Sequence, residues 1–367
     1  MAALRSLVQS LPKAELHSHL AGSVRDSTLR DLMIAASGEE SAAPLLDLES
    51  AQTRSLSDCF KIFDIVHRTV NTSANLERVV REMVEDNAAD NVVYLEMRST
   101  PRRLVDCEWG EGEVETRTLR GVDIDSPVDK ALNFYVETVA RAIEEAVVAM
   151  DEKITVRLIL SVNRTSPLAS IERVVALALA WRQASTIVVG LDISGDPTRG
   201  NMQPILSILE SRVRGKIPVC IHAGEVMNVA ETEAILAYGP ERLGHCCVLS
   251  ESTRRRMLAS KIPLELCPRS NLLTLHLPSF DYHPQADFWL ANSYPLAICT
   301  DDSGVFRCTL SDEIILVQES LGLSAAQTVK LVLASFSFSF CDAAIREDLL
   351  RKAQNEAAAL LEAYEQG

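Results

Sequence analysis

Two histidines near the start of the sequence, His17 and His19, are spaced for metal binding. Alternate side chains of a β-strand point to the same face, so both imidazoles could reach one metal ion. A catalytic zinc site generally has three protein ligands and a water, so this pair alone does not complete a site. The remaining ligands have to come from other parts of the chain.

Candidate ligands follow at the ends of later strand-like segments, where His222 and the adjacent Asp301 and Asp302 stand. Together with the first pair, His222 and Asp301 would complete the ligand set of one zinc ion per chain. Zinc lowers the pKa of a bound water toward neutrality and so provides hydroxide. Glu225 would stand near the metal and donate a proton to substrate, whereas His245 and Asp301 could orient the hydroxide and take its proton.

Less specific interpretations stand beside these assignments. Glu225 could be a carboxylate in the first turn of a helix, and Asp302 could be a loop cap. The basic segment Arg98–Arg103 could be a solvated edge or a phosphate site. Three other histidines are expected at the surface or in loops: His67, His276 and His283.

The elements that would position these residues alternate between strands and helices. Helical spacing of apolar residues occurs between the strand-like segments, for example in 170–184, 229–238 and 311–321. Such alternation predicts an α/β fold, a (β/α)₈ TIM barrel, whose chemistry lies at the C-terminal ends of the strands. A doubly wound sheet is the alternative, but no Gly-x-Gly-x-x-Gly follows a strand. The eight predicted strands are Ala14–Leu20, Val92–Arg98, Ile154–Ser161, Thr186–Ile193, Ile217–His222, Arg242–Cys246, Ile262–Cys267 and Leu296–Thr300.

Three regions exceed the minimal barrel, which we expect to form a single domain over residues 1–367. Residues 23–69 are long enough for a helical insertion that could serve as a lid. Residues 107–127 are rich in Gly, Glu and Asp, which indicates an exposed loop. Residues 324–367 have the pattern of two terminal helices.

Composition restricts the partners and the compartment. A net charge of −15 argues against binding to a nucleic acid polymer or an anionic membrane surface. Nine scattered cysteines without Cys-x-x-Cys favour reduced thiols in the cytosol. No apolar run reaches the length of a membrane helix, and the first residues do not form a signal peptide. We therefore expect a cytoplasmic protein that is a monomer.

The same stretches carry a family resemblance: the sequence is similar to the adenosine/AMP deaminase family of zinc-dependent barrel enzymes. Within it, the sequence most resembles the adenosine deaminase-like branch that acts on N6-methyl-AMP. The family-wide matches are residues 11–20, 190–196, 222–225, 242–245 and 299–302. The matches to the branch are residues 60–67, 94–102, 262–267, 270–271 and 299–306.

The resemblance implies zinc-dependent hydrolysis of N6-methyl-AMP to IMP and methylamine, by attack of zinc hydroxide on purine C6. It implies that Glu225 protonates N1, Asp302 contacts N7 and the backbone of Gly195 contacts N3. His245 would position the hydroxide. It also raises Phe63 and His67 to candidates for the substrate pocket, in which His19 would take part as well. The implied zinc ligands are His17, His19, His222 and Asp301.

Ala21 bears on the choice between nucleoside and nucleotide. The adenosine deaminases of the family that this chain resembles have an aspartate at this position, where it meets the ribose end of the substrate. That carboxylate would repel a 5′-phosphate. Its absence favours a purine nucleotide substrate, although the branch often has asparagine. Arg269 is a second departure from the branch, which usually has a small polar residue at this position. Its side chain either adds positive charge near the mouth of the barrel or points outward. Candidates for phosphate binding are Ser23, Ser99, Thr100 and Arg102.

Three alternative functions remain open from the sequence. An adenosine deaminase would act on the free nucleoside, and Ala21 is the feature against it. A metal-dependent phosphoesterase on the same barrel would release inorganic phosphate. A non-catalytic binding protein would have lost a ligand or the proton donor, and none of those positions is lost.

Overall fold

The computed structural model describes residues 2–37, 56–110, 112–114 and 118–366, and it contains one eight-stranded parallel sheet. Neighbouring strands pair in the order β1-β2-β5-β6-β7-β8-β9-β10. Every predicted strand is present. Their bounds are β1 (Lys13–His19), β2 (Val92–Ser99), β5 (Thr155–Asn163), β6 (Val188–Ser194), β7 (Val219–Ala223), β8 (Arg242–His245), β9 (Leu264–Leu266) and β10 (Leu296–Ile298).

Backbone hydrogen bonds between the first strand and the end of the last one close the barrel. The His19 N–H donates to the Asp301 carbonyl at 2.7 Å, and the Asp301 N–H donates to the His17 carbonyl at 2.8 Å. Closure therefore occurs at residues that the sequence singled out for chemistry. The predicted (β/α)₈ barrel is confirmed.

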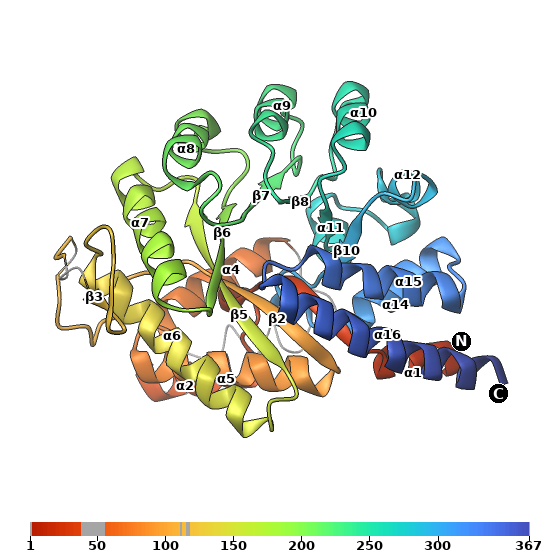
Figure 1. Cartoon of the computed structure of the whole chain (residues 1–367), viewed down its shortest axis with the longest axis horizontal. Coiled ribbons are helices and arrows are strands. Elements are labelled where there is room, and N and C mark those ends of the chain that lie inside the picture. The colour runs from red at the N-terminus through yellow and green to blue at the C-terminus, as the bar shows by residue number, and fades with distance from the viewer. Residues whose placement is uncertain (1, 38–55, 111, 115–117, 367) are drawn as a thin grey trace.

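Helices surround the strands (Figure 1). In α6, Val136, Val139 and Ile143 recur at helical spacing and are buried, and the Asp129 carboxylate caps the first turn. The helices are α1 (Ala2–Ser10), α2 (Asp26–Ser37), α4 (Leu56–Thr69), α5 (Ser73–Ala89), α6 (Lys130–Ala149), α7 (Leu168–Ala184), α8 (Met202–Ile208), α9 (Val229–Tyr238), α10 (Glu251–Ser260), α11 (Pro268–Thr274), α12 (Ala286–Ala291), α13 (Ser303–Phe306), α14 (Leu310–Leu321), α15 (Ala325–Ala334) and α16 (Ala343–Gln366).

The segment between α15 and α16 packs against strand residues of the barrel. Phe340 forms a buried cluster with Ile159, Val189 and Cys220, which lie on three neighbouring strands. A Cβ at Gly190 would lie 2.6 Å from the Phe340 ring, so this approach requires glycine. The helix α16 returns to pack on α1, which brings the two ends of the described chain together (Figure 1).

The structure bears differently on the predictions made for the three regions beyond the minimal barrel. Residues 23–69 contain α2 and α4, but residues 38–55 lie outside the described part, and a lid function stays a prediction. The region predicted to be an exposed loop contains a short antiparallel hairpin of β3 (Thr118–Leu119) and β4 (Val122–Asp123). Leu119 and Ile124 anchor it because both side chains are buried. Residues 324–367 contain α15 and α16.

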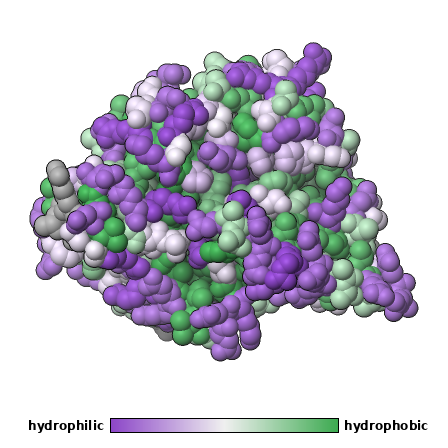
Figure 2. Space-filling view, viewed as in Figure 1, coloured by the Kyte–Doolittle hydropathy of each residue, from purple (hydrophilic) through white to green (hydrophobic). Residues whose placement is uncertain are grey.

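Hydrophilic residues are spread between smaller hydrophobic areas on the face drawn in Figure 2. Within the described residues, we find no helix with the length and apolar character that a bilayer crossing requires.

Candidate active site

Three histidines and one aspartate converge at the C-terminal end of the barrel. The Nε2 atom of His19 lies 3.2 Å from Nε2 of His17 and 3.3 Å from Nε2 of His222. The Asp301 Oδ1 atom lies 3.3 and 3.4 Å from the same atoms of His17 and His19. Four atoms bound tetrahedrally to one zinc at about 2.0–2.1 Å would be about 3.3–3.4 Å apart. These four distances agree with that geometry, and the ligand atoms of all four predicted residues lie within 4.8 Å of one another, so together they could hold one metal ion.

Two buried carboxylates lie behind two of the histidine rings. The Nδ1 atom of His17 lies 2.8 Å from Glu265 Oε2, and that of His222 lies 3.0 Å from Asp192 Oδ1. Because each carboxylate faces Nδ1, the Nε2 atoms are left for the metal. A carboxylate behind a ligating histidine is the usual support of a protein zinc site.

Arginines inside the barrel compensate the two carboxylates. Arg98 contacts Asp192 at 3.0 Å and Glu265 at 2.5 Å, and Arg242 contacts Glu265 at 2.6 Å. Burial by itself would raise the pKa of the Glu265 carboxyl, but Arg98 and Arg242 hold it well below its usual range. These carboxylates stay ionised, as support of a metal-binding histidine requires.

The backbone is in the left-handed region at two residues of the site. His245 and Asp301 each have a φ of 62°, which non-glycine residues adopt infrequently. The His245 ring lies against the rings of His17 and His222, with centroids 5.1 and 4.9 Å apart. Its Nδ1 atom is 3.2 Å from the side-chain amide of Asn271. Strained conformations of this kind concentrate at functional sites, where packing maintains them.

Glu225 and Asp302 are carboxyl groups whose surroundings favour the protonated form. Burial raises the pKa of the half-buried Glu225, and the nearby Asp301 carboxylate adds to the increase. Burial and then Asp301 raise the pKa of Asp302 well above its ordinary value. The Asp302 Oδ1 atom is buried and has no hydrogen-bond partner among the described residues. Both groups could therefore donate a proton or a hydrogen bond to a ligand.

Gly195 follows β6 with a φ of 106°, a conformation in which a side chain would be strained. An added Cβ would lie 2.5 Å from Oδ1 of Asn163, the last residue of the neighbouring strand. Glycine therefore keeps the backbone open at the position that the sequence assigned to purine contact.

Two of the hydroxyls suggested for phosphate binding have partners inside the protein. Ser23 Oγ donates to the His19 carbonyl at 2.8 Å, and Ser99 Oγ lies 2.7 Å from the hydroxyl of Tyr135. Both serines are buried. The structure therefore places them as supports of β1 and β2 in this conformation.

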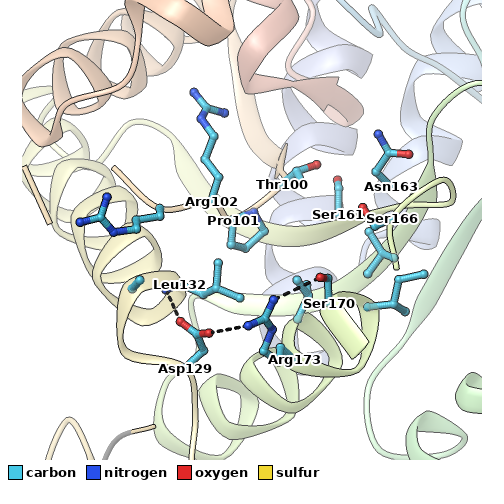
Figure 3. Close-up of a pocket in the computed structure, with 15 residues that line it drawn as sticks. Thr100, Pro101, Arg102, Asp129, Leu132, Ser161, Asn163, Ser166, Ser170 and Arg173 are labelled. Atoms are coloured by element: carbon cyan, nitrogen blue, oxygen red, sulfur yellow. Dashed lines mark hydrogen bonds and ion pairs between the residues drawn. The ribbon is translucent and has the colours of Figure 1, made fainter. Parts of the chain in front are cut away.

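Thr100 and Arg102 line a cavity of about 200 Å³ between the ends of β2 and β5 and the helices α6 and α7 (Figure 3). Arg173 is already engaged there, because it contacts Asp129 at 3.4 Å and Ser170 at 3.1 Å. Arg102 extends away from that pair and donates to the Val70 carbonyl at 2.7 Å. Its guanidinium is thus held between the cavity and the end of α4.

The other two candidates, Phe63 and His67, lie on α4. Phe63 is half-buried against the hydrophobic core, whereas His67 is exposed. Ala21 lies between the metal-site residue His19 and Gly22, in the 3₁₀ turn Leu20–Gly22, where it is half-buried.

Sequence reasoning missed four buried polar side chains of the site. For Asp192 and Glu265 the available signal was a charged residue near the end of, or inside, an apolar strand. Asn271 in α11 and His283 after a 3₁₀ turn gave no such signal. Arg269, the second departure noted in the sequence, contacts the buried Glu313 of α14, with its Nε 2.8 Å from Glu313 Oε1.

A zinc-bound structure of an amidohydrolase from Burkhoderia ambifaria has the same barrel fold, with a TM-score of 0.80 at 19% identity. The chain belongs to the adenosine deaminase family, whose model matches residues 12–356. Family membership makes the protein a deaminase-type hydrolase.

Relatives with a similar length cover most of the chain. The N6-mAMP deaminase of Arabidopsis thaliana is 36% identical over 93% of this chain and 96% of its own. The N6-methyl-AMP deaminase of Bos taurus is 31% identical, with 93% of both chains covered. A crystal structure of the Arabidopsis N6-mAMP deaminase superposes with a TM-score of 0.80 at 34% identity, over 95% of this chain and 99% of that one.

Proposed function

We propose that this protein is a zinc-dependent hydrolase that converts N6-methyl-AMP and water to IMP and methylamine. The observation that carries the zinc chemistry is the cluster of His17, His19, His222 and Asp301 with buried carboxylates behind two of its rings. The choice of substrate is supported by relatives named for N6-methyl-AMP. An Arabidopsis relative has also been crystallised with IMP and with GMP, which are purine nucleotides.

Each residue of the site has a role in this proposal. A zinc ion held by the four ligands would supply hydroxide near neutral pH. Glu225, whose pKa burial raises, holds a proton for purine N1. Asp302, also protonated, donates to N7, and the backbone N–H of Gly195 donates to N3. His245 orients the nucleophile, and its side chain is buried beside the ligand rings.

The nucleotide is favoured over the nucleoside because residue 21 carries no charge. The half-buried Ala21 cannot repel a 5′-phosphate, as a carboxylate there would. Thr100 and Arg102 are the remaining polar candidates for the phosphate, because Ser23 and Ser99 are engaged with protein groups. We further propose that Phe63 and His67 of α4 line the substrate pocket. One zinc per chain and a monomer are expected.

Incubation of the zinc-loaded protein with N6-methyl-AMP, AMP and adenosine tests the proposal directly. We expect methylamine and IMP from the first compound, at a kcat/KM at least about tenfold above the other two. A preference for adenosine would contradict the nucleotide assignment. Release of inorganic phosphate would instead identify a phosphoesterase on the same barrel.

A further inference from the structure

The side chain of His283 is buried beyond the metal site, and its hydrogen-bond partners determine which nitrogen carries the proton. His283 follows the 3₁₀ turn Phe280–Tyr282 and is 6% exposed. Its Nδ1 atom accepts hydrogen bonds from the backbone N–H of Gln285 at 3.2 Å and of Ala286 at 3.1 Å. A nitrogen that accepts from a backbone N–H cannot itself carry a proton. The ring proton of His283 therefore lies on Nε2.

This assignment fixes the orientation of the next side chain. The Nε2 atom of His283 lies 3.3 Å from the side-chain oxygen of Asn271, which accepts the hydrogen bond. With its oxygen turned toward His283, Asn271 presents its NH₂ group to His245, whose Nδ1 is 3.2 Å away. That Nδ1 must then be an acceptor, which leaves the proton of neutral His245 on Nε2.

We infer that His283 and Asn271 form a positioning relay that holds His245 in the Nε2–H form, with that N–H available to the metal site. At the His283 end, two backbone N–H groups set the direction of the hydrogen bonds, because a backbone N–H can only donate. The three side chains are almost fully buried, at 6, 1 and 3% exposure, so water does not compete for these hydrogen bonds. The functional consequence of the relay rests on the proposed deaminase activity.

The surroundings keep the relay in one arrangement. The Phe280 ring packs against His283 with centroids 5.1 Å apart. Asn271 lies in α11, where its backbone N–H donates to the Cys267 carbonyl at 2.9 Å. Burial lowers the pKa of His283 to about 4, so the ring is neutral near pH 7. Because Nδ1 of the neutral ring is an acceptor, its single N–H, on Nε2, donates to Asn271.

The wrong tautomer of His245 would present a lone pair to the nucleophile in place of a hydrogen-bond donor. Residues that hold a site imidazole in its tautomer typically change activity by about 10- to 100-fold when replaced. The relay therefore matters for kcat, and it need not alter KM.

Asn271→Asp tests the direction of the relay, because a carboxylate accepts but cannot donate. The tautomer of His245 should invert, with the proton on Nδ1. The measurement is the pair of imidazole ¹⁵N shifts of His245 in zinc-loaded protein labelled with ¹⁵N-histidine. In the unsubstituted protein we expect an unprotonated Nδ1 and a protonated Nε2, and in the variant the reverse. The kcat should fall about 10- to 100-fold with KM within about threefold.

Two substitutions of His283 distinguish its role in the relay from its contribution to the stability of the fold. In His283→Gln, the amide nitrogen replaces Nε2 and can still donate to Asn271, but the acceptor for the two backbone N–H groups is lost. In His283→Asn, the amide oxygen replaces Nδ1 as acceptor, but the donor is lost. We expect the Gln variant to melt about 2–6 °C lower and keep its kcat within about threefold. The Asn variant should melt near the unsubstituted protein and lose about tenfold in kcat.

An unchanged Nε2–H form of His245 in Asn271→Asp would overturn the relay, whatever the substrate. Equal losses of kcat and melting temperature in the two His283 variants would also overturn it, since that result describes a structural role only. Absence of turnover by the unsubstituted zinc-loaded protein would contradict the proposed function and leave the ¹⁵N test decisive for the relay.

Discussion

A Cβ atom added to Gly22 would lie 1.7 Å from Oδ1 of Asp302, so the two residues keep their positions only because residue 22 has no side chain. Gly22 ends the 3₁₀ turn after β1, and Asp302 directly follows the metal-site residue Asp301. This contact couples the turn after the first strand to the carboxyl group proposed to bind purine N7.

Replacing Gly22 by alanine should move Asp302 and weaken purine binding. We expect kcat/KM for N6-methyl-AMP to fall at least about 100-fold, because a buried hydrogen bond to substrate is lost and the overlap forces a shift. Zinc content should be unchanged, since the four ligands keep their partners. Gly110→Ala is the control, because its Cβ would meet only the flexible Glu113 side chain at 3.1 Å. Full activity of the Gly22 variant would remove Asp302 from the site.

Glu225→Gln should retain zinc and lose nearly all turnover, by about 10²–10⁴-fold, if Glu225 is the proton donor. The amide has almost the same shape but cannot give up a proton to N1. Metal analysis and steady-state rates on the same sample make the test. Loss of zinc would instead identify Glu225 as a ligand, and surviving turnover would require a different donor.

The pH dependence of kcat follows from the same carboxyl group. Burial raises the pKa of Glu225, so its acid form persists above the pH at which a solvated glutamate ionises. As pH rises through this raised pKa the proton is lost, and kcat should decrease on the alkaline side. Residual turnover of Glu225→Gln should lack this decrease, as measured from rates between about pH 5 and 9. The same alkaline decrease in both proteins would assign it to another group.

The sequence predicted the barrel and the four-residue metal cluster because both leave local patterns. Continuously apolar segments are typical of strands buried on two faces, and His17 and His19 share one face of such a strand. Equivalent ends of parallel strands meet at one edge of a barrel, so His222 and Asp301 could be grouped with them.

The supporting residues could not be predicted in this way because their roles depend on three-dimensional pairing. Glu265 and His17 are separated by 248 positions and meet only through barrel closure. His283, in a loop-like Tyr-His-Pro sequence, is buried because the turn before α12 folds back toward α11. Ser99 was a plausible phosphate ligand until Tyr135 of α6 was placed beside it.

Asp192→Asn tests the support behind His222. The amide keeps the volume, but it weakens the interaction with the His222 Nδ1–H and leaves Arg98 with less compensation. We expect zinc affinity to fall about 10- to 100-fold, measured by competition with a chromophoric chelator. Chelator treatment of the unsubstituted protein should abolish turnover, and added zinc should restore it. Asp348→Asn is the control, because the half-buried Asp348 of α16 pairs with Arg351 and Lys352 and not with a metal-site histidine. Unchanged affinity in Asp192→Asn would show that His222 needs no such support.

Ala21→Asp should shift the preference from nucleotide toward nucleoside. A carboxylate at this half-buried position, next to Gly22, would repel a 5′-phosphate dianion and could accept a hydrogen bond from a 5′-hydroxyl. We expect kcat/KM for N6-methyl-AMP to fall at least about tenfold, while that for N6-methyladenosine rises or is unchanged. Ala21→Asn has nearly the same size without the charge, so it separates repulsion from steric exclusion. Equal losses in both variants would show that volume, and not charge, selects the nucleotide. An unchanged ratio in the aspartate variant would place the phosphate away from residue 21.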